Sequence, residues 1–543
     1  MELKPENNLS EEDDCLKQAE TQEETSFSVK PDGEKSNIKK KDGAVKSAVL
    51  TGNVNTDTSV EDGEPQKTMH KMYRDMDSLL GFGKFQHFQI WVFQTLISII
   101  GGYDGLQLIF MVSDPPDWYC AEGEEKCPST GEVCEGGNIV YNTTHENYLN
   151  SLTVQQNWVC DQKLRGSNVL TAVVAGVIFN SLIFGQLSDK IGRRAILHIT
   201  NILTMVIRLI SYHLTEYYYL FLVLSALGTN FEPIGSRAGL TMVPEYCNEL
   251  GRKVALISGW VWWVVGQTSF PFLAMYANNW YWLSVGSTLC HIFIVLLYPF
   301  VPESPRLLYS QKKYDRTAEV LTTIRRINKD EPIPDMKKFL EEMAKSETEE
   351  TSTLVIMSMF KERNLLRLLI CMATLWSVND YFYFGGLLNA QNLAGNMFVN
   401  MSLTALTELP SVFIGQYLID RFGRRWSHVG CMLTATGFFL INLCIINEAG
   451  TDNAVFGISL AAKTVSNVSW YIMWYQALEV FPSCLRNTGI NMSKLVSLTV
   501  KMSTPYTVKL DKVDKRLPYV IFVCLGVIGT IASFLGIVGS LSS

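Results

Sequence analysis

A polar motif that occurs twice, each time between two long apolar runs, constrains the fold of this chain more than any other feature. The first copy, GQLSDKIGRR, contains Asp189, and the second, GQYLIDRFGRR, contains Asp420. The aspartates are separated by the same number of residues as the glycines that follow them, Gly192 and Gly423. A repeat of this length is too long for a solenoid and predicts two related halves of one membrane domain.

The residue types of the motif suit a tight turn between two spans. Glycine reaches backbone angles that are closed to other residues. An Asp before a helix can accept the free N–H groups of its first turn and complement the helix dipole. The Arg pairs, which include Arg193 and Arg424, can each reach a carboxylate on a neighbouring helix. The alternative is that both copies only set the topology of the turns.

Apolar runs of about 20 residues, the length that a helix needs to cross a bilayer, account for most of the chain. Hydrophobic residues make up 47% of the sequence, and the mean hydropathy is +0.11. The expected spans are 88–112, 167–187, 195–215, 217–244, 254–276, 280–301, 364–387, 396–419, 426–447, 455–478, 489–509 and 518–540. The sequence therefore predicts an all-α membrane protein with two six-helix halves, in residues 75–301 and 364–543.

Two polar regions lie outside these halves. Residues 1–74 are acidic and poor in aromatics, which predicts a disordered tail, and they carry no cleavable signal. Residues 302–363 form a charged central loop, in which the pattern from Met336 to Ala344 predicts a helix. Lys and Arg are frequent in 188–194, 245–253, 302–363 and 420–425, which places both termini of a multi-pass membrane protein in the cytosol. We expect this membrane to be the plasma membrane. The loop from Lys509 to Arg516 does not fit this rule, because it should be external and yet is net positive.

The loop at 113–165 has the composition of an extracellular module. It contains four cysteines and the glycosylation sequon at Asn142, which together predict two disulfides and a glycan. Three pairings are possible, and the sequence does not choose between them. The cysteines are Cys120, Cys127, Cys134 and Cys160. A metal site is not expected, because no Cys-x-x-Cys is present and only His145 is near.

Three further motifs, together with the paired turns, carry a resemblance to a known family. They are PESPR at Pro302–Arg306, NMFVNM at Asn396–Met401 leading to Glu408–Pro410, and EVFPSCLRNTG at Glu479–Gly489. Over residues 75–540 the chain resembles the organic cation, anion and carnitine transporters of the major facilitator superfamily. The 74-residue leader and the end of the chain just after the last span depart from the pattern of that family, and the early end suggests a truncated form.

The resemblance implies a major facilitator fold and a central solute cavity. It places Trp376, Tyr383, Glu408 and Trp470 on the cavity wall. Leu498 falls where cation carriers have Asp and anion carriers have Arg, so the resemblance leaves the charge of the solute open.

The residues themselves also point to a polar cavity within the spans. Ionisable side chains inside a membrane usually face a cavity or one another, and nine are expected here: Asp104, Arg208, Glu232, Arg237, Asp380, Glu408, Lys463, Lys494 and Lys501. Aromatic rings lie at the same depth, including Tyr471 beside Trp470, and rings suit an organic cation. Lys494 and Lys501 share a helix face with Leu498, which would favour a carboxylate. The alternatives are internal ion pairs that only orient helices and an aromatic belt at the membrane interface.

An acid–base pair at the end of the fourth span of each half accompanies the turn motif. Each pair keeps the same spacing, and all eight residues fall on the cytosolic side by the charge rule. We expect them to form ion pairs that close this side: Asp189, Arg193, Glu245 and Arg252 in the first half, and Asp420, Arg424, Glu479 and Arg486 in the second.

The sequence thus predicts an alternating-access transporter of small organic ions, with cations or carnitine-like zwitterions favoured and a sodium ion or proton as a possible coupling ion. An organic anion transporter, a sugar porter and a membrane sensor without flux are the alternatives. No catalytic or nucleotide-binding motif is present, so no enzyme activity and no cofactor are expected. The net charge of −7 and the lack of basic runs with interleaved aromatics argue against nucleic-acid binding.

Overall fold

The computed structural model describes residues 76–116, 118–120, 139–346, 363–448, 450–481 and 486–538. The chain divides into two compact units, Met1–Leu79 and Leu80–Ser543. In the first unit only the start of α3 (Met76–Leu80) is described, and the predicted disordered tail lies outside the described residues. Everything below concerns the second unit.

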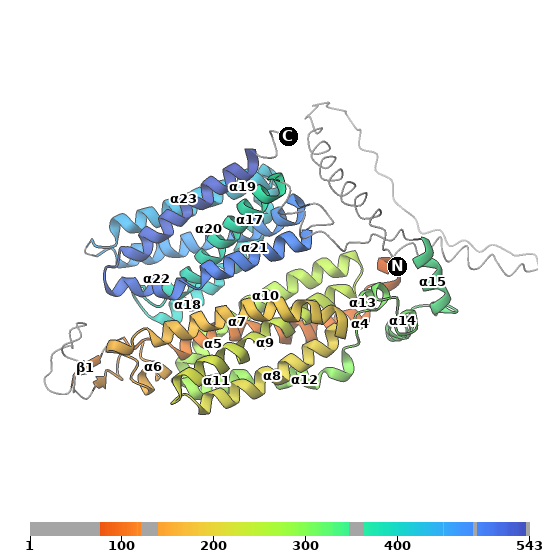
Figure 1. The fold of residues 1–543 in the computed structure, drawn as a ribbon, viewed down its shortest axis with the longest axis horizontal. Helices are drawn as coiled ribbons and strands as arrows, with labels where there is room; N and C mark the ends of the chain where they lie inside the picture. Colours follow the sequence, from red (N-terminus) through yellow and green to blue (C-terminus); the bar gives the residue numbers. More distant parts are fainter. Residues whose placement is uncertain are drawn as a thin grey trace, which may run out of the picture. The chain divides into compact units, whose positions relative to one another are not determined.

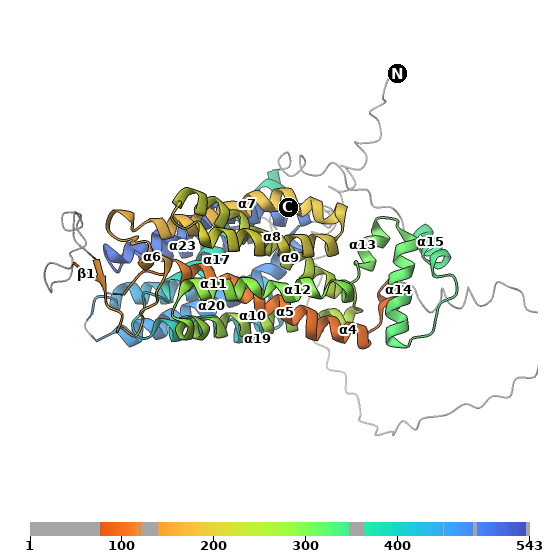
Figure 2. The same ribbon diagram turned by 90° about the horizontal axis from the view of Figure 1, so that it is seen from below.

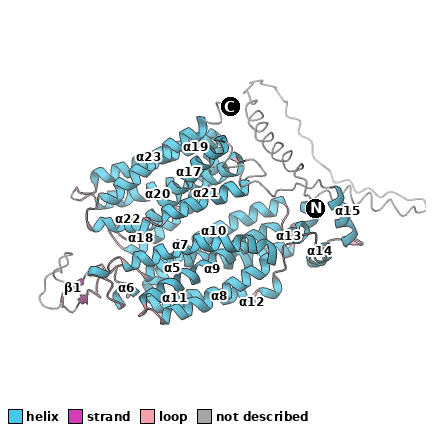
Figure 3. Ribbon diagram, viewed as in Figure 1, coloured by secondary structure: helices cyan, strands magenta, loops and turns pink. Residues whose placement is uncertain are grey.

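The second unit consists almost entirely of long helices that run back and forth between two ends (Figures 1 and 3). The N-terminal half contains α4 (Lys84–Phe88), η1 (Gln89–Gln94), α5 (Thr95–Met111), α7 (Arg165–Ile191), α8 (Arg193–His213), α9 (Tyr218–Glu245), α10 (Glu249–Ala277), α11 (Trp280–Leu289), α12 (His291–Leu296) and η4 (Tyr298–Phe300). The C-terminal half contains α17 (Arg363–Asn389), α18 (Met397–Leu406), α19 (Glu408–Ile445), α20 (Asp452–Val480), α21 (Arg486–Lys501), α22 (Thr504–Val508), η5 (Lys509–Lys512) and α23 (Leu517–Val538). Length and hydropathy alone mark four described stretches as able to cross a membrane: Lys84–Met111, Arg193–His213, Met397–Ile445 and Leu517–Leu535.

Each half packs mainly within itself. In Figure 1 the orange-to-green helices of the N-terminal half lie together, and so do the teal-to-blue helices of the C-terminal half. Figure 2 shows the same bundle from below. The halves meet where α10 contacts α18 and α19, and where α7 contacts α21 and α22. These contacts place α10 between the N-terminal and the C-terminal half.

The two ends of the bundle differ in what they carry. We call one the hairpin end, since it bears the strands β1 (Trp118–Cys120) and β2 (Ile139–Tyr141), which pair antiparallel, together with α6 (Leu152–Gln155) and η3 (Cys160–Gln162). We call the other the hinge end, since it bears Gly192 and Gly423 and leads to α13 (Pro305–Ser310), α14 (Tyr314–Asn328) and α15 (Met336–Ser346). The helix predicted from Met336 to Ala344 is confirmed as α15.

Several expected spans are helices with a local break. The first contains the π-helical turn η1, and the eleventh is split before α22, where Pro505 cannot donate a backbone hydrogen bond. The glycines of both hinges adopt positive φ, 113° at Gly192 and 75° at Gly423, as the turn prediction requires. At Gly192 a Cβ would also lie 2.4 Å from a carboxylate oxygen of Glu303, so a larger residue would displace the side chain that caps α8.

Candidate solute-binding site and gates

A cluster of aromatic and polar side chains lies where α10 of the N-terminal half meets the C-terminal half. We call it the inter-half cluster and define it by Trp260, Trp263 and Gln267 of α10, Tyr383 of α17, Glu408 of α19, and Lys463 and Trp470 of α20. The indole rings of Trp260 and Trp470 stack across the two halves, with centroids 5.6 Å apart and an angle of 26°. This stacking brings three of the predicted site residues, Tyr383, Glu408 and Trp470, into one place.

Glu408 is the buried acid of the cluster, with 1% of its surface exposed. The Tyr383 hydroxyl lies near this carboxylate and interacts with it electrostatically. The Gln267 amide, oriented to satisfy its neighbours, donates to Glu408 Oε1 over 3.2 Å and accepts from Trp263 Nε1 over 3.2 Å. The second carboxylate oxygen, Oε2, has no hydrogen-bond partner among the described residues. A buried carboxylate oxygen without a donor is costly, so the cluster favours an additional positive or hydrogen-bond-donating group.

Lys463 places a cation on an aromatic face of this cluster. Its ammonium lies 3.7 Å from the centroid of the Tyr383 ring and donates to the Tyr383 carbonyl oxygen over 2.7 Å. It also interacts electrostatically with Glu408. The site therefore combines a carboxylate with a ring that already holds a positive charge.

A second charged group lies beside the cluster on α17 and α21. Asp380 accepts from Lys494 Nζ over 2.9 Å and, less closely, from Trp470 Nε1 over 3.4 Å. The Lys494 ammonium lies 4.3 Å above the ring of Trp376. Trp376 itself is fully buried and packs edge-on against Trp474, with centroids 4.7 Å apart. In this structure Trp376 is thus part of a packed core, whereas the sequence had led us to expect it on an open wall.

The remaining predicted wall residues make their described contacts with other residues, although Lys501 also interacts electrostatically with Lys463. Tyr471 is turned toward Gln416 of α19, and its hydroxyl also lies 3.1 Å from that of Tyr475, one turn further along α20. Leu498 is buried, and the Lys501 ammonium lies 4.4 Å from the ring of Phe384. The side chains of Glu232 and Arg237 lie outside the described residues.

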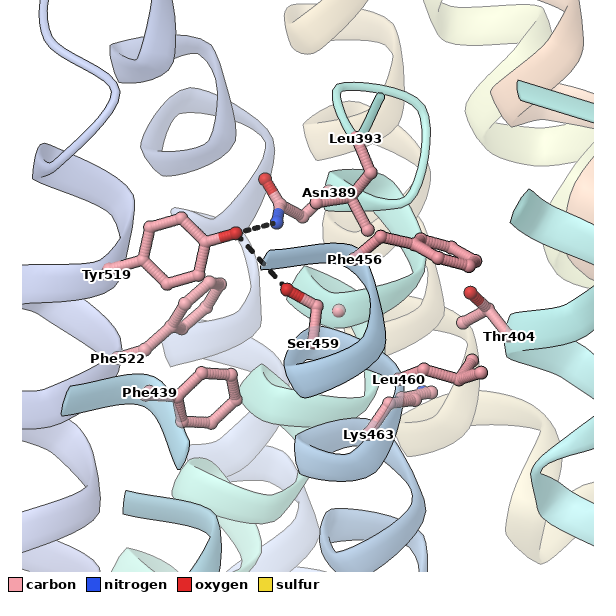
Figure 4. A pocket seen from close by; sticks show the side chains of 11 residues that line it. Asn389, Leu393, Thr404, Phe439, Phe456, Ser459, Leu460, Lys463, Tyr519 and Phe522 are labelled. Carbon is pink, nitrogen blue, oxygen red and sulfur yellow. Dashed lines mark hydrogen bonds between the residues drawn. The ribbon is translucent and has the colours of Figure 1, made fainter. Parts of the chain in front are cut away.

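Lys463 also borders a narrow pocket inside the C-terminal half (Figure 4). At its polar end Tyr519 accepts from Asn389 Nδ2 over 3.2 Å, and its hydroxyl lies 3.3 Å from Ser459 Oγ. The phenyl rings of Phe439 and Phe522 lie on the same side of the pocket as Tyr519, and Phe456 and Thr404 lie across from them (Figure 4). The figure shows Lys463 at the edge of this pocket, so its chain spans from the pocket to the inter-half cluster.

At the hinge end, the first copy of the motif is tied to the PESPR segment. Glu303 accepts from the backbone N–H groups of Arg193 over 3.0 Å and Arg194 over 3.2 Å. Glu303 thus caps the start of α8, a role that we had predicted for Asp189, whose side chain lies outside the described residues. The Arg193 guanidinium forms an ion pair with Glu245 of α9, and Ser304 donates to the same carboxylate over 2.5 Å.

The second copy of the motif is less fully described. Asp420 accepts from Gln416 over 2.9 Å. Arg252 and Arg424 each make a polar, ring or electrostatic contact with another residue. The side chains of Asp189, Glu479 and Arg486 lie outside the described residues. The predicted latch is therefore visible in part, as the Arg193–Glu245 pair within the N-terminal half.

At the hairpin end, one carboxylate joins the two halves. Asp114, just after α5, accepts from Lys509 over 3.2 Å and Lys512 over 2.5 Å, both on η5. Lys509 also donates to the Lys163 carbonyl oxygen over 2.6 Å. Burial raises the pKa of Asp114, but the two ammonium groups outweigh it and hold that pKa below its ordinary value. These contacts give a structural reason for the positive loop that the charge rule did not explain.

The glycosylation sequon and one of the four predicted disulfide cysteines are visible at the same end. Thr144 Oγ1 donates to Asn142 Oδ1 over 2.8 Å. Cys160 is disulfide-bonded, and the side chains of the other three cysteines lie outside the described residues. The pairing of the four cysteines in two disulfides stays a prediction.

Comparison with known proteins decides the family. The model of the sugar (and other) transporter family matches residues 136–541. The chain belongs to the sugar (and other) transporter family. It is 24% identical to the organic cation transporter protein of Drosophila melanogaster, over 75% of this chain and 74% of that protein. It is 25% identical to the human organic cation/carnitine transporter 2, over 71% of this chain and 68% of that protein.

Solved structures agree on the fold of this family member. The inward-open xylose transporter XylE from E. coli superposes with a TM-score of 0.59 at 14% sequence identity, over 82% of this chain and 95% of that one. The predicted major facilitator fold is thus confirmed, and so is the prediction of a transporter in place of an enzyme.

Some residues of this transporter's cluster escaped the sequence analysis. Trp260, Trp263 and Gln267 lie in an apolar run, where nothing distinguishes a ring that faces the other half from one that faces lipid. Lys463 was recognised as an intramembrane charge, but its position on the Tyr383 ring depends on the packing of α17 against α20.

Proposed function

We propose that this chain is an alternating-access transporter of small organic cations or carnitine-like zwitterions, which bind at the inter-half cluster. The observation that carries the proposal is the combination at Glu408: a buried carboxylate oxygen without a donor, next to an aromatic ring with an ammonium on its face. A cation bound there would gain both an ion pair and cation–π contacts. A hexose could donate a hydroxyl hydrogen bond to Glu408, but it offers no positive charge for an ion pair or for the aromatic faces.

Lys463 has a defined part in this proposal. A side-chain cation beside Glu408 offsets the charge of the empty site, since an unpaired carboxylate inside a bilayer is costly. An incoming cation would displace the Lys463 ammonium from the Tyr383 ring. A zwitterion would instead leave it in place, with its ammonium at Glu408 and its carboxylate at Lys463.

The two ends of the bundle would act as gates. We place the hairpin end outside the cell, with its disulfides and a glycan on Asn142, and both termini in the cytosol of the plasma-membrane protein, in line with the distribution of Lys and Arg. The eight charged residues of the predicted latch then lie at the cytosolic mouth. The Arg193–Glu245 pair and its counterparts in the second half would stabilise the state in which that mouth is shut.

A cell uptake assay with labelled tetraethylammonium, carnitine, an aryl carboxylate and a hexose tests the substrate class. We expect saturable uptake of tetraethylammonium or carnitine, and its loss in Glu408→Gln, which keeps the size of the side chain. Glu448→Gln, at an exposed glutamate beyond α19, is the matched control and should transport like the parent. Uptake of the hexose or the aryl carboxylate alone would contradict the proposal.

A further inference from the structure

A cavity that shares no residue with the inter-half cluster lies where the two halves meet on the side of the bundle. Its wall consists of residues of α7 and α9 from the N-terminal half and of Met502, which follows α21 in the C-terminal half. The helix α7 packs against both α9 and α21 (Figure 1). The cavity volume is about 340 Å³. Pockets that bind small molecules usually measure about 300–1,000 Å³, so this space is large enough for more than water.

The lining of the cavity is mostly apolar. Ala172 and Ala175 line it from α7, and their short side chains leave space that larger residues would fill. Leu222 and Met502 complete the apolar wall. Tyr219, which also lines the cavity, is 81% exposed, so the cavity opens on the outer surface of the bundle. In a membrane protein that surface faces lipid, and an apolar chain from the bilayer can enter.

The polar groups of the cavity gather at its hairpin end. Arg165 begins α7 and Tyr218 begins α9, and the Arg165 guanidinium carbon lies 4.7 Å from the centroid of the Tyr218 ring. No hydrogen bond from the Arg165 side chain to a described residue accompanies this contact. The Tyr218 hydroxyl is buried next to Asn168 and donates to no described residue. The mouth of the cavity therefore offers a positive charge and hydrogen-bond donors to an anionic group.

The length of the cavity corresponds to one leaflet of a bilayer. From Arg165 to Ala175 the helix α7 rises by about 15 Å, at roughly 1.5 Å per residue. This is half of the roughly 30 Å hydrocarbon core of a membrane. Tyr217 and Tyr219, which are 65% and 81% exposed, lie near the start of α9, and exposed tyrosines are typical of the membrane interface. The charged mouth thus lies at the level of lipid headgroups, and the apolar wall lies at the level of acyl chains.

Two hydrogen bonds at the cavity join the halves. Thr171 Oγ1 donates to the Met502 carbonyl oxygen over 3.0 Å. The Tyr506 hydroxyl donates to Asn168 Oδ1 over 2.8 Å. If the halves separated at the hairpin end, Met502 would leave the wall. A molecule that fills the cavity would therefore favour the arrangement of the halves seen here, because it binds this state better than the separated one.

We propose that the cavity binds one phospholipid from the leaflet at the hairpin end, with its phosphate at Arg165 and one acyl chain beside Ala172 and Ala175. A guanidinium group suits a phosphate, because it can form two parallel charge-assisted hydrogen bonds with it. A sterol would bring only a hydroxyl group and would leave the charge of Arg165 unmatched. The proposal does not depend on which solute is carried, so a failure to transport organic cations would leave it standing.

Photolabelling of the purified full chain in detergent micelles tests the site. The probe is a phosphatidylcholine with a diazirine on one acyl chain, and mass spectrometry compares adducts on α7 and α9 with those on α23, where Ile528 and Ile531 are exposed. Adducts should be several-fold more frequent on α7 and α9. Unlabelled phosphatidylcholine should displace the probe about tenfold better, or more, than diacylglycerol with the same chains, which lacks the phosphate. Equal displacement by diacylglycerol or by cholesterol, or adducts no more frequent than on α23, would overturn the proposal in the parent chain alone.

Four variants separate this cavity from the rest of the lipid-facing surface. Ala175→Phe fills the cavity and should remove most adducts on α7 and α9, while Ala454→Phe, at an exposed alanine of α20, should leave them unchanged. Arg165→Gln should weaken displacement by phosphatidylcholine by about tenfold or more. Arg165→Lys keeps a charge for the phosphate and should restore most of this affinity, which a purely structural role of Arg165 would not produce. If Ala175→Phe and Arg165→Gln fold and label like the parent, the cavity is not a phospholipid site.

Discussion

Removal of the charge on Asp114 should loosen the hairpin end by an amount that can be worked out from its contacts. Asp114→Asn weakens two charge-assisted hydrogen bonds between the halves, and such bonds contribute about 1.5–3 kcal/mol each where they are buried. Lys512 is 51% exposed, so its bond is screened and contributes little, whereas Lys509 is only 19% exposed. We expect a loss of about 1–2 kcal/mol, which changes the ratio of closed to open states by roughly 5–30-fold.

The assay uses a thiol placed beneath this contact. Ser167 is buried there and lies 3.5 Å from the Pro505 carbonyl oxygen, so Ser167→Cys is a small change. A membrane-impermeant maleimide added from the hairpin side should label it roughly 5–30-fold faster in Asp114→Asn than in the parent. Asp161→Asn, at an exposed acid of η3, is the control. Equal labelling of Asp114→Asn and parent would refute the idea that Asp114 holds the halves together.

The pH dependence of the same contact follows from the sign of its pKa shift. The pKa of Asp114 lies below its ordinary value, so the contact contributes stability above that value and loses it as the pH falls through the depressed pKa. The ratio of labelling rates between variant and parent should therefore be constant from about pH 5 to 8 and shrink only in stronger acid. A ratio that already falls near neutral pH would contradict the ion pairs.

Three other outcomes follow from the packing and the hinge contacts. Gly266→Leu should force α5 and α10 apart, since a Cβ there would lie 2.6 Å from the Ile99 carbonyl oxygen. We expect the free energy of unfolding to fall by about 1–3 kcal/mol or more. Gly457→Leu is the control, because a Cβ at Gly457 would meet no atom within 4 Å. Trp376→Ala should destabilise the chain by about 3–5 kcal/mol, and normal thermal stability with weaker solute affinity would show that the ring lines the site instead. Arg193→Ala should speed labelling at the hinge end and leave solute affinity unchanged, whereas equal labelling at equal surface expression would refute its role in a latch.

Features that recur along the chain were predictable from the sequence, and contacts between distant helices were not. The duplicated hinge implied two halves, and the positive φ of Gly192 and Gly423 follows from the turn that both copies make. Glu303, which caps α8 from the far end of the half, was not predicted from the sequence to take this role. Such a cap depends on how the spans pack, which hydropathy does not specify.

The candidate site shows the same limit. Glu408, Tyr383 and Trp470 could be proposed from a resemblance and from the cost of charge in a membrane. Their partners on α10 could not, because Gln267 and the tryptophans beside it differ from lipid-facing residues only by the rotation of the helix. Trp376 illustrates the converse, since its place two turns from Tyr383 suggested a shared wall, and yet it packs fully against Trp474.

The most direct test of the central claim compares a cation with a neutral molecule of the same shape. Choline and 3,3-dimethylbutan-1-ol differ in whether the quaternary centre is nitrogen or carbon, and each can compete with labelled tetraethylammonium for uptake. If Glu408 and the rings around it bind a cation, choline should inhibit the parent at least about 30-fold better, equivalent to roughly 2 kcal/mol. Glu408→Gln should lose most of this preference. Equal inhibition of the parent by the two compounds would contradict the account.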